Sequence, residues 1–172
     1  MILSKTDIKR YVAEKRLKIE PFNEDLVQGN GVDLRLGNQI ARLKPSKTVF
    51  DTRSTQINYE DFFTKEVGDS FLLSPQERIL VHTLETIELD NSIMGFVNLR
   101  SSYARVGLSL PPTIVDAGFK VQLTLEVIGG SFLIRLHAKD RFCHLVLARL
   151  TSDSVSYKGV YLGQRGVTYP KF

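Results

Sequence analysis

The chain has 172 residues, and its 23 Lys and Arg against 19 Asp and Glu give a formal net charge of +4. Hydrophobic residues make up 42% and charged residues 24%, which is typical of one folded domain and excludes a disordered chain or a coiled coil. The single cysteine, Cys143, excludes an intramolecular disulfide and any zinc site that needs two cysteines of one chain.

Residues 5–15 are predicted to form the one long helix. Ser4 followed by Asp7 is a capping box, and Ile8 and Tyr11 recur at helical spacing. The first ten residues carry four charged side chains without an apolar stretch, and no apolar run approaches the roughly 18 residues of a membrane span. We therefore expect a cytoplasmic protein without a membrane partner.

Short β-rich runs follow the helix, separated by turn pairs such as Asn-Gly, Asp-Asn, Pro-Pro and Gly-Gly. The expected strands are 17–19, 32–36, 39–43, 70–73, 78–84, 86–89, 94–99, 121–127, 132–136 and 142–150. Some runs are almost continuously apolar and others alternate, as in two facing sheets. The pattern predicts a mainly β sandwich or barrel.

Two stretches are more polar than the predicted strands. Residues 44–69 are expected to form an excursion from the sandwich rather than a second domain. Residues 152–172 combine three glycines with tyrosines and basic side chains, which predicts a mobile tail able to contact phosphate groups. The sequence thus predicts a single domain over residues 1–172.

A polar run from Arg100 to Arg105 (Arg-Ser-Ser-Tyr-Ala-Arg) interrupts a predicted strand. Ser101 or Ser102 is expected to N-cap a short helical turn over 103–106, and a helix N-terminus between two arginines suits an anion. The mild excess of positive charge also suits a polyanionic small ligand. The alternative is a capped turn whose arginines pair with carboxylates.

A second candidate segment runs from residue 111 to residue 127. A strand enters a turn with Asp116 at the bend, and Leu123 and Leu125 then alternate with Thr124 and Glu126. Glu126 should therefore project from the face opposite the core leucines. Taken alone, such a glutamate is most often a solvated surface residue.

Several common templates are absent from the sequence. The three histidines, His82, His137 and His144, do not have the spacing of metal ligands. The chain has no nucleophile elbow, Walker loop, Rossmann fingerprint or basic aromatic pattern of an RNA-binding sheet. We expect no metal site on the protein itself and no nucleic-acid partner.

Six stretches, 31–37, 77–85, 100–108, 115–119, 123–126 and 163–166, follow one another in an order that resembles the dCTP deaminase and dUTPase superfamily, and the deaminase branch more closely. The run Arg-Ser-Ser-x-Ala-Arg at 100–105, with the Asp and Glu that follow, is the most specific signal. The resemblance implies a distorted β-barrel or jelly roll that works as a homotrimer, with each site built between subunits. Residues 152–172 would close over the nucleotide as a C-terminal lid.

The resemblance also implies a reaction, the zinc-independent hydrolytic deamination of dCTP to dUTP and ammonia. Glu126 would be the general base that deprotonates the attacking water. Ser101 and Arg105 would position the water and the reacting base, helped by the backbone carbonyl of Ile114. Asp116 would contact the deoxyribose, or activate water for diphosphate release in a dUTPase.

Eight positions are implied to bind the substrate: Arg100, Ser102, Ala104, Thr124, Leu125, Tyr157, Lys158 and Gln164. A magnesium ion would enter through the nucleotide phosphates. Three residues depart from the family pattern: Val160 stands where a lysine is usual, and Leu99 and Val121 stand where glycines are usual. A bifunctional deaminase and dUTPase, a plain dUTPase and a non-catalytic nucleotide sensor stay open as alternatives.

Overall fold

Strands dominate the fold in the computed structural model, which describes residues 1–172. The strands are β1 (Leu17–Glu20), β2 (Val27–Gln28), β3 (Gly31–Leu43), β4 (Phe63–Val67), β5 (Ser70–Leu73), β6 (Arg78–Leu89), β7 (Ile93–Leu99), β8 (Thr113–Val115), β9 (Lys120–Ile128), β10 (Ile134–His137) and β11 (Arg141–Arg149). The helical segments are α1 (Lys5–Ala13), η1 (Glu24–Leu26), η2 (Tyr59–Asp61) and α2 (Ser101–Arg105). None of them has the length and apolar composition needed to cross a bilayer.

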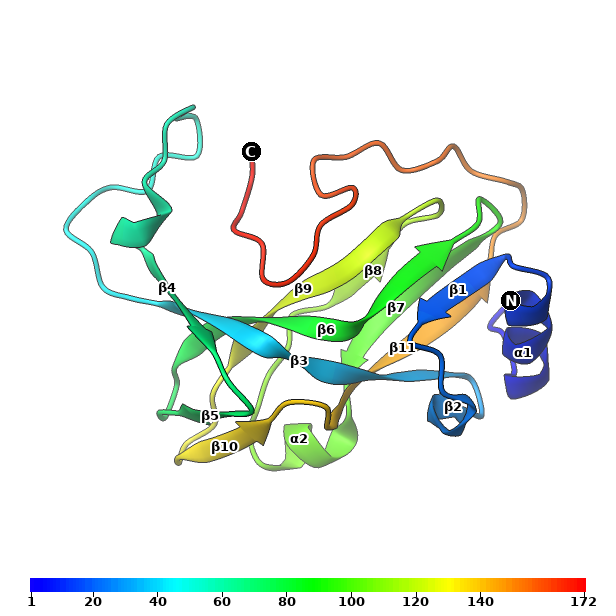
Figure 1. The fold of residues 1–172 in the computed structure, drawn as a ribbon, viewed down its shortest axis with the longest axis horizontal. Helices are drawn as coiled ribbons and strands as arrows, with labels where there is room; N and C mark the ends of the chain where they lie inside the picture. The colour runs from blue at the N-terminus through cyan, green and yellow to red at the C-terminus, as the bar shows by residue number, and fades with distance from the viewer.

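Nine strands form one antiparallel sheet along the path β1-β6-β3-β11-β7-β8, with β2 and β4 paired to β3 and β9 paired to β6. β5 and β10 form a separate antiparallel pair. Figure 1 shows that the large sheet curls strongly, so that its two ends approach each other. The predicted mainly β class, with a distorted barrel and one N-terminal helix, is confirmed.

Two predicted strand breaks are register shifts within continuous strands. The pair Gly37-Asn38 lies in β3 between Leu36 and Ile40, where the register of β3 against β6 shifts. The expected break near residue 85 is also wrong, because β6 continues through Glu85. The sequence also missed β4, a mostly polar strand inside the 44–69 excursion that pairs with β3 through its backbone.

Glu85 is tolerated inside β6 because its charge is fully bound. Its side chain is 0% exposed, and it accepts hydrogen bonds from the backbone N–H of Arg35 at 2.8 Å and from the Arg35 Nε at 2.6 Å. A buried carboxylate without such donors would be strongly destabilising. The pair joins β6 to β3 close to the register shifts in both strands.

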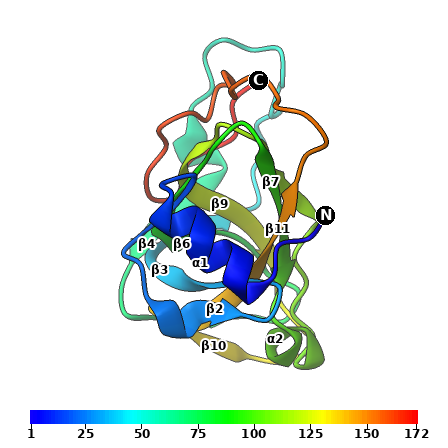
Figure 2. The same ribbon diagram turned by 90° about the vertical axis from the view of Figure 1, so that its right-hand side faces the viewer.

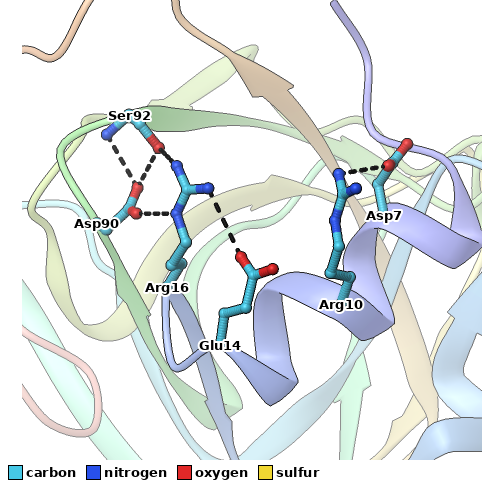
Figure 3. Close-up of polar contacts among 6 residues, drawn as sticks. All are labelled: Asp7, Arg10, Glu14, Arg16, Asp90 and Ser92. Atoms are coloured by element: carbon cyan, nitrogen blue, oxygen red, sulfur yellow. Dashed lines mark hydrogen bonds and ion pairs between the residues drawn. The ribbon is translucent and has the colours of Figure 1, made fainter.

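Helix α1 covers one end of the sheet beside β1 and β2 (Figure 2). It begins with the predicted capping box, in which the N–H of Asp7 donates to Ser4 Oγ and the Asp7 carboxylate accepts the N–H of Ser4. Beyond the helix, Arg16 Nε donates to Asp90 at 2.7 Å, and Asp90 also accepts from Ser92 (Figure 3). Burial opposes the ionisation of Asp90, but the donors outweigh it and lower its pKa.

The sheet has an inner face that holds the core and an outer face formed by β3, β6 and β9. On β9, Leu123 and Leu125 are 3% and 2% exposed, whereas Thr124 and Glu126 are half-buried on the opposite face. The predicted alternation along this strand is confirmed. The tail of the chain returns beside β9 and covers part of the outer face, where Val167 is buried (Figure 1).

His82 is a residue of β6 and is 6% exposed. Its Nδ1 lies 2.8 Å from the carbonyl oxygen of Thr83, while its Nε2 is buried without a hydrogen-bond partner. Gly37 makes room for the ring, since a Cβ at that position would lie 2.2 Å from ring atoms of His82. Burial lowers the pKa of His82, so the folded protein favours the neutral ring.

We expect His82 to give the folding stability a pH dependence on the acid side. The unfolded state takes up a proton near its ordinary pKa of about 6.5, which the folded state resists, so stability is complete above that pH and falls below it. For one proton the slope is at most about 1.4 kcal/mol per pH unit. Urea unfolding of the wild type and of His82→Phe at about pH 7.5 and about pH 5 checks this. Equal losses in both proteins would contradict it.

Candidate functional site

A cavity of about 490 Å³ lies between the outer face of the sheet and the C-terminal tail. Its apolar wall includes Leu43, Phe63, Leu80, Phe119 and Pro170. Six predicted site residues also line it: Ile114, which was predicted through its backbone carbonyl, Asp116, Thr124, Glu126, Tyr157 and Gln164. An apolar wall that faces a few polar groups is the usual composition of a small-molecule site.

Glu126 reaches this cavity from β9, with 31% of its side chain exposed. Its Oε1 accepts a hydrogen bond from Arg78 Nη1 at 3.0 Å, across the β6–β9 pair. Arg78 is its sole side-chain partner in the chain, which leaves Oε2 free. Arg105, which was expected to position the water and the reacting base, does not contact Glu126 within one chain.

The tail is hydrogen-bonded along β9. The N–H of Gln122 donates to the carbonyl of Gln164 at 3.2 Å, and the N–H of Gly166 donates to Gln122 Oε1 at 2.7 Å. Thr124 Oγ1 donates to the carbonyl of Gly166 at 3.3 Å and accepts the N–H of Thr168 at 3.1 Å. The Thr124 hydroxyl therefore holds the tail as well as lining the cavity.

Gln164 carries a free acceptor at the cavity wall. Its Nε2 donates to the backbone carbonyl of Gln122 at 2.9 Å, but its Oε1 is buried without a hydrogen-bond partner. Buried polar atoms are rarely left unpaired, because an unmade hydrogen bond costs free energy. A ligand that offers an N–H or O–H donor would satisfy this oxygen.

Helix α2 differs from its prediction at its start. Neither Ser101 nor Ser102 is the N-cap, because the helix begins at Ser101 and Arg100 occupies the cap position in extended backbone without a side-chain cap. Arg100 is engaged: its Nε lies 3.3 Å from the buried Asp33 carboxylate, and its Nη1 donates to the carbonyl of Arg141 at 3.2 Å. The pairing expected as the alternative thus holds for Arg100, whereas Arg105 has no carboxylate partner.

The remaining α2 candidates, Ser101, Ser102, Ala104 and Arg105, are exposed and do not line the cavity. Figures 1 and 2 place α2 and the tail at opposite ends of the molecule. One chain therefore does not bring Ser101 and Arg105 together with Glu126. Ser101 and Arg105 face solvent and Glu126 faces the cavity, so all three are accessible to another molecule.

The other candidates also divide by position. Leu125 is 2% exposed in the core, so only its backbone is available to a ligand. Lys158 does not line the cavity beside Glu126 but a second one of about 760 Å³. Asp116 and Tyr157 line both cavities, so they connect the two.

The three departures from the family pattern lie outside the cavity wall. Val121 is 1% exposed and belongs to the core, so its side chain points away from the cavity. Leu99 packs against the same core, and Val160 is exposed on the tail. Their added bulk therefore does not fill the space beside Glu126.

No three His, Cys, Asp or Glu side chains lie together in a group that could hold a metal ion. Cys143 is buried in the core, and burial raises the pKa of its thiol. Sequence reasoning missed Arg78, because its contact with Glu126 exists only once β6 and β9 pair. No local signal in the sequence singles out this arginine.

Comparison with known proteins gives one consistent result. Residues 2–150 match the family model described as dCTP deaminase-like. A relative named dCTP deaminase, from Saccharolobus solfataricus, is 51% identical over 173 residues, covering 100% of this chain and 92% of the relative. A protein of Sulfolobus islandicus rod-shaped virus 1, named probable deoxyuridine 5'-triphosphate nucleotidohydrolase, is 46% identical and covers 99% of both chains.

A solved structure supports the fold independently. The structure of 2'-deoxycytidine 5'-triphosphate deaminase from Agrobacterium tumefaciens superposes with a TM-score of 0.67 at 22% sequence identity. The match covers 87% of this chain and 48% of that one, so this chain spans about half the length of that protein. At this identity the likeness concerns the fold alone.

Proposed function

The chain belongs to the dCTP deaminase family, and on this premise we propose that it hydrolyses dCTP to dUTP and ammonia with Glu126 as the general base. The observation that carries the proposal is the Glu126 carboxylate, held in the cavity with Oε2 free to accept a proton. Deamination needs such a group beside the amino-bearing carbon of the base.

The chemistry asks Glu126 to move two protons in turn. The carboxylate takes a proton from water while the water oxygen bonds to the amino-bearing carbon, and passes it to the adjacent ring nitrogen. It then takes the proton of the new hydroxyl and gives it to the amino nitrogen, so that the carbonyl of dUTP forms as the carbon–nitrogen bond breaks and ammonia leaves. Oε2 is suited to both transfers because it is not engaged by another donor. The free Oε1 of Gln164 offers an acceptor for an N–H or O–H of the bound nucleotide.

We place the complete site between two copies of the chain, in a homotrimer. Glu126, Asp116, Thr124 and Gln164 line the cavity of one copy, whereas Ser101 and Arg105 are exposed on α2 at the other end. A neighbouring copy can supply α2, as in a head-to-tail ring. This arrangement accounts for exposed polar residues that have no role within one chain.

The triphosphate is assigned to basic and polar groups around this shared site. Ser102 on α2, Arg100 at the N-cap position of α2 and Lys158 on the tail carry the donors that phosphate oxygens need. Asp116 contacts the deoxyribose. The protein has no group of three His, Cys, Asp or Glu side chains that could hold a metal ion. Mg²⁺ is therefore held mainly by the phosphate oxygens and offsets their charge.

Product analysis tests the proposal. The purified protein is incubated with dCTP and Mg²⁺, and separately with dUTP, and nucleotides, ammonia and diphosphate are resolved in each reaction. Ammonia with accumulating dUTP is the expected result. Tight nucleotide binding without turnover would instead identify a non-catalytic nucleotide sensor.

A second activity, the hydrolysis of dUTP to dUMP and diphosphate, is favoured by two observations. Asp116 lies at the junction of the two cavities, where a carboxylate can activate water. A viral relative with 46% identity carries a dUTP hydrolase name. Diphosphate from both nucleotides would establish a bifunctional enzyme, and diphosphate from dUTP alone would establish a dUTPase.

We propose that the tail, residues 152–172, is a lid that is anchored at its far end. Tyr169 stacks on Tyr59 and Phe63 at centroid distances of 4.9 and 5.0 Å, and Lys65 lies 4.8 Å from its ring. The Tyr59 hydroxyl donates to the carbonyl of Pro170 at 2.5 Å. The 44–69 excursion therefore provides the surface on which the lid closes.

Tyr169→Ala is expected to loosen this anchor. Loss of the stacked ring should raise the KM for dCTP by roughly 10-fold, since each aromatic contact contributes about 0.5–1.5 kcal/mol beyond its buried area. Limited proteolysis should cut the tail faster in the variant, while its melting temperature stays close to that of the wild type. Unchanged KM and unchanged cleavage would rule out the anchored lid.

A further inference from the structure

Arg78 and Glu126 form an ion pair of which one member, Glu126, lines the cavity. The residues of the other ion pairs do not line it. Arg78 begins β6, and Glu126 lies diagonally opposite on β9, with Nη1 3.0 Å from Oε1. The Arg78 side chain is 57% exposed and does not line the cavity. Its guanidinium therefore binds Oε1 of Glu126 from outside the cavity and leaves Oε2 without a partner.

We infer that Arg78 is a positioning residue for the deamination, an inference that rests on the proposed function. Arg78 fixes one oxygen of the Glu126 carboxylate so that the other faces the cavity. Without this contact the glutamate side chain is free to rotate about its terminal bonds, since no other side chain of the chain binds it. A general base acts only when its oxygen lies within hydrogen-bond reach of the water that it deprotonates.

The same two strands carry a second ion pair that serves as a matched control. Lys120 of β9 and Glu88 of β6 are also 3.0 Å apart, and Glu88 has a second partner in Lys18 of β1, also at 3.0 Å. Their side chains are 62% and 32% exposed, close to the 57% and 31% of Arg78 and Glu126. Neither Lys120 nor Glu88 lines the cavity beside Glu126. Any loss that comes only from breaking an exposed ion pair between β6 and β9 should therefore be small at both positions.

Exposed ion pairs contribute little to folding stability, so neither Arg78→Ala nor Lys120→Ala should unfold the protein. A change in turnover at Arg78 alone would then reflect the orientation of the carboxylate. The contact is a single N–H to oxygen hydrogen bond rather than a two-bond fork. A lysine ammonium can make such a bond, so Arg78→Lys should restore much of the lost rate.

The experiment compares dCTP deamination by five proteins: the wild type, Arg78→Ala, Arg78→Lys, Lys120→Ala and Glu126→Gln. Arg78→Ala should lower kcat by roughly 10- to 100-fold, because small errors in the placement of a reacting group are costly. Its KM for dCTP should stay within about threefold of the wild-type value, because the substrate is not contacted. Arg78→Lys should recover most of the rate, and Lys120→Ala should match the wild type.

Each outcome separates this inference from the proposed function. If the wild type releases ammonia and Glu126→Gln does not, but Arg78→Ala matches Lys120→Ala, the positioning role is overturned and the proposed function stands. A loss of melting temperature in Arg78→Ala that Arg78→Lys does not repair would show a structural role and overturn it as well. If the wild type releases no ammonia from dCTP, both fail.

Discussion

Glu126→Gln is expected to abolish most of the deamination of dCTP. The amide has the shape of the carboxylate but cannot take a proton from water at neutral pH, so kcat should fall by about 10²- to 10⁴-fold. The KM for dCTP should change little, since the substitution removes a proton acceptor and leaves the cavity wall in place. Initial rates of ammonia release from dCTP provide the measurement.

Glu88→Gln is the matched control for this substitution. Glu88 lies on β6, is 32% exposed and, like Glu126, pairs across β6 and β9, with a further ion pair to Lys18 of β1. Its replacement should leave the rate unchanged. A Glu126→Gln protein that deaminates dCTP at the wild-type rate would remove the role assigned to Glu126, whatever its stability.

Mixed assemblies of two inactive variants should regain activity if the site is shared between copies. Arg105→Ala lacks the α2 contribution, and Glu126→Gln lacks the base, so each variant alone should be inactive or nearly so. In a trimer formed from equal amounts of both, a site works when Glu126 comes from one variant and Arg105 from the other. Random mixing in a ring then restores about a quarter of the wild-type activity in the whole mixture, and about a third in mixed trimers separated from the two parents.

Co-expression with two different affinity tags isolates the mixed assemblies for this measurement. Ser101→Ala with Glu126→Gln gives a second pair that should behave in the same way, because Ser101 lies on the same exposed helix. Mixed assemblies that are as inactive as their parents would show that α2 and Glu126 do not meet across an interface. A monomer in solution would contradict the shared site directly.

Local patterns in the sequence determined the fold class, and the resemblance to the dCTP deaminase and dUTPase superfamily supplied the residues of the candidate site. The capping box of α1 and the alternation along β9 are local features, set by hydrogen bonds and side-chain directions within a few residues. The outward direction of Glu126 followed from that alternation alone. Local patterns were less reliable where a polar residue lies inside a strand. Glu85 predicted a strand break, but its charge is neutralised by Arg35, which is distant in the sequence.

Only the tertiary structure decided which of these residues meet. The pairing of Arg78 with Glu126 joins residues 48 positions apart, and the bond from Tyr59 to Pro170 spans 111 positions. Such contacts depend on strand pairing and on how the sheet curls, and no periodicity within one segment specifies them. The same reason separates α2 from the cavity: the motif 100–105 and Glu126 are only about 20 residues apart in sequence, yet the curl of the sheet places them apart in the fold.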